Sequence, residues 1–97
     1  MSFDEFRQST TAPTAAPPSG LSAALRALWW EARGDWDQAH QLAQNDRTPD
    51  GSWVHAYLHR KEGDEGNAGY WYARAGRPTA KGPAAEEWTA MVKELLG

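Results

Sequence analysis

The sequence predicts an all-α protein of about five helices, arranged as two stacked antiparallel helical hairpins and a C-terminal capping helix. A Gly-Asp pair at Gly34-Asp35 recurs as Gly63-Asp64, and each pair separates two stretches whose apolar residues recur every three or four positions. Glycine ends a helix without strain and aspartate caps the next, so each pair predicts a tight helix–helix turn. Pro83 suits the first turn of a final helix.

Composition limits both the architecture and the functions open to it. The chain has 97 residues, enough for one small domain, and its six tryptophans can supply a dense core. It has no cysteine, which excludes disulfides, thiolate metal sites and a thiol nucleophile. The net charge of -3 and the lack of a lysine-rich stripe argue against nucleic acid. With no long apolar run and no secretory signal, we expect a soluble, cytoplasmic protein with no membrane contact.

The N-terminal part is expected to differ from the rest. Residues 1–20 are predicted to form a flexible tail, and residues 21–97 the helical repeat-like domain. Phe3 and Phe6 could form one docked turn, but a frayed terminus is the simpler interpretation. Residues 9–20 contain three prolines and no large apolar residue, which favours a linker.

The four hairpin helices are predicted from their apolar stripes. The first spans about residues 21–33 and the second about residues 36–44. A loop over residues 45–51 follows, and then helices over about residues 52–62 and 65–75. The predicted inner positions are Leu21, Leu25, Leu28, Trp29 and Ala32; Trp36, Ala39, His40 and Ala43; Trp53, Val54, Tyr57 and Leu58; and Ala68, Trp71, Tyr72 and Ala75.

The last predicted helix begins near Pro83 and runs to the end of the chain. Its inner stripe is Trp88, Met91, Val92 and Leu95. Stacked hairpins expose an apolar face at each end of the stack, and this helix would cover one of them.

At these residues the chain resembles tetratricopeptide repeats, including their Sel-like branch. The matching positions are Ala27, Gly34, Asp35, Trp36 and Ala39 in the first unit and Ala56, Gly63, Asp64, Ala68 and Ala75 in the second, with Trp71-Tyr72 similar to the Trp-Tyr of the Sel-like second helix. The chain departs from the family in its shorter period, in Glu65 at the turn aromatic, and in having only two units. The resemblance implies a protein-binding module. The run W-V-H-A-Y-L-H-R is also similar to one in a group of small uncharacterised proteins, which implies no activity.

Histidines suggest a possible metal site. His55 and His59 lie one helical turn apart and Glu62 follows three residues later, so the three could bind Zn or Ni. The alternative is that they are ordinary surface residues. His40 could join them only from the other hairpin.

Superposing the two units predicts a contact strip for a partner. The first helices of successive hairpins would line one wall and present Arg26, Trp30, Arg33, His55 and His59. Tyr70 is a second aromatic off its helix's inner stripe. Trp30 and Tyr70 can each be either core residues or exposed anchors, and exposed tryptophan beside arginine is typical of binding hot spots.

The leading functional hypothesis is therefore a non-catalytic binding or scaffold module for a protein or peptide, with a homodimer possible. The alternative is a small-molecule or metal-binding protein that uses His55, His59 and Glu62 together with the surrounding aromatics. No nucleophile elbow or phosphate loop occurs, so the sequence does not predict an enzyme and names no catalytic residue.

Overall fold

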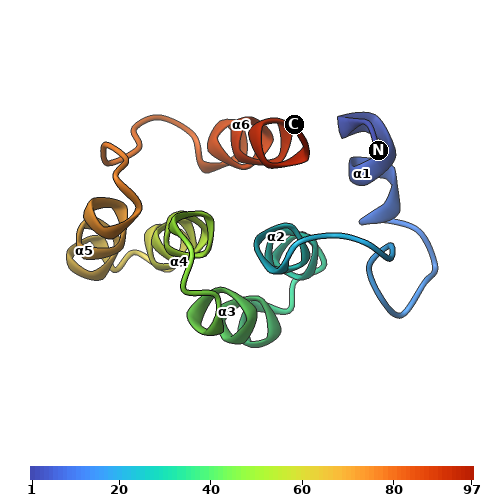
Figure 1. Cartoon of the computed structure of the whole chain (residues 1–97), viewed down its shortest axis with the longest axis horizontal. Helices are drawn as coiled ribbons and strands as arrows, with labels where there is room; N and C mark the ends of the chain where they lie inside the picture. The colour runs from blue at the N-terminus through green and yellow to red at the C-terminus, as the bar shows by residue number, and fades with distance from the viewer.

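The computed structural model describes residues 1–97 as six packed helices with no strand (Figure 1). The helices are α1 (Phe3–Ser9), α2 (Ala23–Ala32), α3 (Trp36–Asn45), α4 (Pro49–Lys61), α5 (Glu65–Ala75) and α6 (Ala84–Leu96). The all-α class and the packed helix pairs are confirmed, and the structure adds a sixth helix. None of the helices has the length and hydrophobicity that a membrane-spanning segment requires.

Two helix pairs, α2 with α3 and α4 with α5, are joined by the predicted Gly-Asp turns. Gly34 and Gly63 both adopt φ of +84°, which a residue with a side chain rarely adopts. The following aspartates each cap the next helix: Asp35 accepts from the Gln38 amide and Asp64 from the Asn67 amide.

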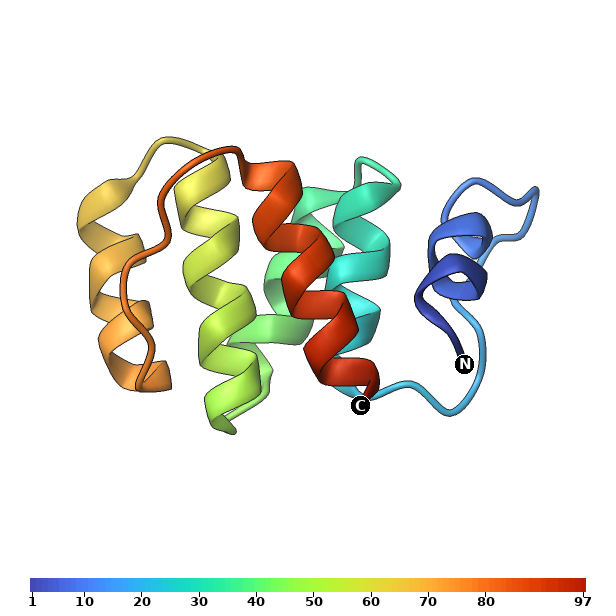
Figure 2. The same ribbon diagram turned by 90° about the horizontal axis from the view of Figure 1, so that it is seen from above.

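Helix α6 closes the core by packing on α2 and α4, on the side opposite to α3 (Figures 1 and 2). On the inner side of α6, Met91 and Val92 are fully buried, and the Trp88 indole donates a hydrogen bond to the Leu28 carbonyl at 3.2 Å. The predicted stripe of the last helix is therefore its packing face.

A polar cluster at Glu87 holds α6 in place. The Glu87 carboxylate accepts a 2.5 Å hydrogen bond from the Tyr72 hydroxyl. It also forms an ion pair with Arg60 at 2.8 Å. Burial, and then the bond to Glu87, raise the pKa of Tyr72, so the hydroxyl remains a donor. Because each group is paired, the cluster leaves no uncompensated buried charge.

The N-terminal residues differ from the sequence expectation. Residues 3–9 form α1 instead of a frayed tail, with Ser2 and Glu5 in a reciprocal capping box. Phe6 is fully buried and lies 5.8 Å from the Trp88 ring. The linker is also attached to the end of α2, because the Arg33 guanidinium donates to the carbonyls of Ala12 and Thr14.

Helix α4 begins at Pro49, earlier than the predicted start near Ser52. Residues 45–51 were expected to be a loop, but Thr48 caps the helix by accepting from the Gly51 amide, and Pro49 is its first residue. Proline fits there because the first helical amide has no partner within the helix. The extra turn places Ser52 inside the helix, on the same side as His55 and His59.

Candidate functional site

The three histidines of the chain meet where α3 packs on α4. His40 comes from α3, and His55 and His59 come from successive turns of α4. One ring nitrogen from each lies within 4.8 Å of the other two. The Nε2 atoms of His40 and His55 are 3.0 Å apart. The i, i+4 pair expected from the sequence is thus completed by a third imidazole from the other hairpin.

Two tryptophans enclose this cluster. The Trp36 indole stacks on His40, with ring centroids 4.6 Å apart, and Trp71 of α5 stacks on His55 at 4.0 Å. Trp36 is itself fixed by a hydrogen bond to the Leu58 carbonyl. The cluster is therefore walled by α3 and α5 and has α4 as its floor.

Glu62 orients His59 in the structure. Its carboxylate lies 2.6 Å from Nδ1 of His59, which leaves Nε2 of that ring free. Asp64 is farther from the same Nδ1, at 3.9 Å, and caps α5. Glu62 was predicted as a possible third ligand beside His55 and His59. In the structure His40, His55 and His59 form one group of possible ligands, and His59, Glu62 and Asp64 form a second, more exposed one.

Burial favours the neutral form of the two central imidazoles, His40 and His55. His55 is only 3% exposed, and burial, together with the neighbouring His40 and His59, lowers its pKa to about 4. Burial and His59 likewise lower the pKa of His40. Nδ1 of His55 is buried and has no hydrogen-bond partner in the protein. Neutral imidazoles with free lone pairs are the form that binds metals.

The predicted contact strip does not form one exposed surface. Arg26 is exposed, but Trp30 is half-buried and packs edge-on against Trp29 at 5.0 Å. Arg33 is occupied by the linker carbonyls, and His55 belongs to the buried cluster. The residues do not share one surface because Arg33 is engaged by the linker and His55 lies between His40 of α3 and Trp71 of α5.

Tyr70 lies apart from these residues, on α5. It is 55% exposed, and the Arg74 guanidinium lies 5.8 Å from its ring centroid. Tyr70 is therefore an exposed aromatic and not a core residue.

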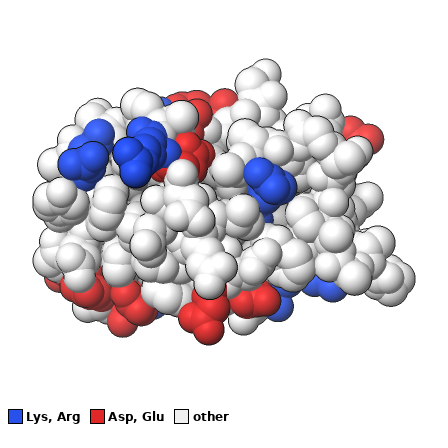
Figure 3. All heavy atoms as spheres, turned by 60° about the horizontal axis from the view of Figure 1, so that its bottom comes forward, with Lys and Arg blue, Asp and Glu red and all other residues white.

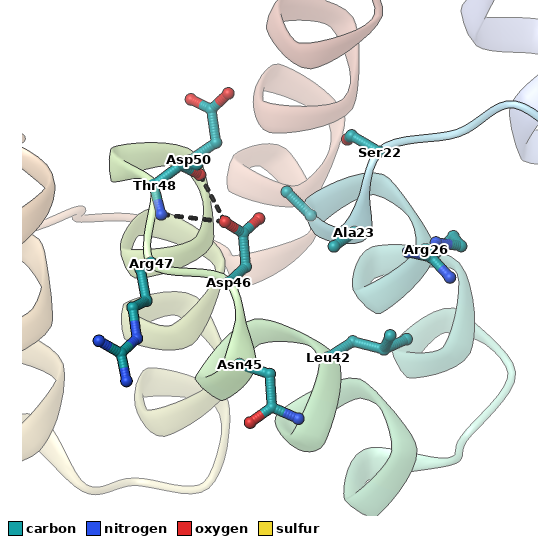
Figure 4. Close-up of a pocket in the computed structure, with 10 residues that line it drawn as sticks. Ser22, Ala23, Arg26, Leu42, Asn45, Asp46, Arg47, Thr48 and Asp50 are labelled. Atoms are coloured by element: carbon teal, nitrogen blue, oxygen red, sulfur yellow. Dashed lines mark hydrogen bonds between the residues drawn. The ribbon is translucent and has the colours of Figure 1, made fainter.

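The largest cavity is an open groove of about 620 Å³ where α2, α3 and the start of α4 meet (Figure 4). Arg26 and Leu42 lie on one side, and Asp46 accepts from the Thr48 amide and hydroxyl. Arg47 points away from Arg26 in Figure 4. The histidine cluster does not line this groove, so the largest cavity and the three histidines lie at separate places.

The sequence indicated that His40 could reach the site only from the other hairpin, and did not predict that it does. The available signal was the i, i+4 spacing of Trp36 and His40, which places both on one side of α3. It could not show that this side meets His55, because the two residues belong to different hairpins.

Comparison with family models, curated proteins and solved structures found no match to this chain, so the site is interpreted from its own geometry.

Proposed function

We propose that this chain binds one divalent transition-metal ion through His40, His55 and His59. The observation that carries the proposal is the convergence of every histidine in the chain on one point between two hairpins. Each is supplied by a well-formed helix. The aromatic stacking described above limits the ways in which the rings can turn.

The donor set favours zinc, with nickel or copper as the other candidates. Imidazole suits these ions, whereas calcium and magnesium prefer oxygen ligands. Zinc–nitrogen bonds of 2.0–2.1 Å in a tetrahedron place two ligand nitrogens about 3.3 Å apart. The 3.0 Å between Nε2 of His40 and Nε2 of His55 is close to that separation. Three protein ligands leave one coordination position for water or another ligand.

Glu62 supports the proposal from outside the ligand set. Metal-binding histidines usually donate their second ring N–H to a carboxylate or carbonyl, which fixes the tautomer. The 2.6 Å contact between Glu62 and Nδ1 of His59 provides such a partner and leaves Nε2 of His59 as the nitrogen that would bind the metal. The ion would join α3 to α4 and so clamp the two hairpins together.

Isothermal titration of chelator-treated protein with ZnCl₂ and NiCl₂ tests this function. We expect one site per chain for wild-type protein and a loss of affinity of about 100-fold or more for His40→Gln and for His59→Gln, because each removes a ligand. Glu62→Gln should lose about tenfold, as is typical of outer-shell partners. Gln41→Ala, exposed on α3 beside His40, is the matched control.

Circular dichroism of the metal-free variants separates lost ligands from lost folding. Folded variants with weakened binding support the proposal. Wild-type protein that takes up neither metal, or His40→Gln that binds as tightly as wild type, would rule it out.

A second candidate function is a protein- or peptide-binding module built from tetratricopeptide-like, Sel-like hairpins, possibly as a homodimer. It is favoured by Tyr70, a large exposed aromatic whose neighbour Arg74 also reaches the Trp71 ring. We expect Tyr70→Ala to leave the melting temperature within about 2 °C, because an exposed side chain contributes little to stability. The same change should abolish capture of a partner, or dimerisation in light scattering. Unchanged capture and unchanged mass would reject this function for Tyr70.

A further inference from the structure

The histidine cluster shares one side of α4 with Ser52, because Ser52, His55 and His59 lie at i, i+3 and i+7. Trp36, His40 and Gln44 lie at i, i+4 and i+8 on α3, and Trp71 and Arg74 lie one turn apart on α5. Positions spaced in this way share one side of a helix, so the three rows run beside each other.

A small pocket of about 210 Å³ lies near the Ser52 end of this side of α4. It is lined by Gln44, Asp46, Arg47, Ser52, Trp71 and Arg74. Trp71 borders both the pocket and the histidine cluster, because its ring also stacks on His55 at 4.0 Å. Ser52 and His55 are three residues apart on α4, which places them roughly 5 Å apart along the helix axis.

Two arginines, Arg47 and Arg74, supply positive charge to the lining of the pocket. Neither Arg47 nor Arg74 forms an ion pair with a carboxylate; Arg74 donates only to the Tyr70 hydroxyl, at 3.3 Å. Asp46 is the single acid of the lining, and its Oδ1 is already used by the Thr48 amide and hydroxyl. The lining therefore holds two available guanidinium groups against one engaged carboxylate.

The charge distribution of this side agrees with that lining. Figure 3 brings the α3 side forward and shows adjacent basic side chains at its upper left, with acidic side chains beside them and further acidic side chains along the lower edge. The whole chain carries a net charge of -3, so a basic area is a local feature. Guanidinium groups match carboxylate and phosphate oxygens in planar, paired hydrogen bonds.

We infer that this pocket binds the carboxylate or phosphate group of a small molecule whose other end reaches the metal held by the histidines. Arg47 and Arg74 pair with the anionic group, and Ser52 and Gln44 offer further hydrogen bonds. The inference rests on the proposed metal function for its second end. A ligand held at both ends would be selected by both its charge and its length.

Titration of metal-free, ¹⁵N-labelled protein with sodium pyrophosphate and with sodium succinate tests the anionic end. Removing the metal prevents these probes from acting as chelators. We expect saturable shifts of the Ser52 amide and the Trp71 indole signals, with the tighter probe identifying phosphate or carboxylate as the preferred group. Arg47→Gln/Arg74→Gln should weaken binding at least tenfold and leave zinc affinity within twofold.

The control is Arg7→Gln/Lys93→Gln, which removes the same charge from exposed residues of α1 and α6. Equal weakening in both double variants, or no saturable shift with either probe, overturns the inference. Anion binding through Arg47 and Arg74 in a protein that takes up no metal would support the anionic end and reject the metal end. Zinc uptake without anion binding would reject only the anionic end.

Discussion

Replacing Phe6 with alanine should lower the free energy of unfolding by about 3 kcal/mol, the usual cost of deleting a buried phenyl ring. Phe6 is fully buried, and its ring packs against Trp88. Loss of the ring also weakens the docking of α1, to which Ser9 contributes by accepting from the Trp29 indole. Urea denaturation followed by circular dichroism measures the change.

Asp4→Ala is the matched control, because Asp4 is exposed on the same helix. We expect it to change stability by less than about 0.5 kcal/mol, as surface substitutions usually do. A loss below about 1 kcal/mol for Phe6→Ala would show that α1 does not dock in solution. The frayed terminus expected from the sequence would then be correct.

Metal-free protein should lose about 1–2 kcal/mol of stability as the pH falls from 7 to 5. The folded state holds the pKa of His55 near 4, below its ordinary value of 6.5, because the ring is buried beside His40 and His59. In this pH range the unfolded chain binds the proton and the folded chain does not. Stability is therefore highest above pH 6.5 and declines toward pH 4.

His55→Phe provides the control for this pH effect. A phenyl ring can retain the stacking against Trp71 but cannot be protonated. We expect urea denaturation of that variant to show less than half of the wild-type change between pH 7 and 5. Lowering of the pKa values of Asp64 and Glu94 places their titration below this window. Equal pH dependence in both proteins would show that His55 is not the group responsible.

The helix pairs were predictable because their signals are local. Gly34 and Gly63 mark the two turns, each followed by a capping aspartate, and the predicted helix over residues 65–75 matches α5. Such signals depend on a few adjacent residues, so they survive without knowledge of the tertiary fold.

The remaining features depend on contacts between distant parts of the chain. Helix α1 has a local capping signal in Ser2 and Glu5, but its burial depends on Trp88, more than eighty positions away. The start of α4 was readable from Thr48 and Pro49, although the same residues also suit a turn.

The candidate site was predicted in part. The pair His55 and His59 follows from helical spacing alone. Its third member, His40, requires the packing of α3 on α4, and the role of Glu62 as an orienting group depends on which nitrogen of His59 it contacts. Periodicity shows which side of a helix a residue occupies, but not what that side meets.

X-ray absorption at the zinc edge of the loaded protein tests the central claim most directly. We predict a first shell that contains three imidazole nitrogens at about 2.0–2.1 Å and one further light atom. His40→Gln should reduce the imidazole count by one. A shell made mainly of oxygen, or an imidazole count unchanged by His40→Gln, would contradict a metal centre that joins the two hairpins.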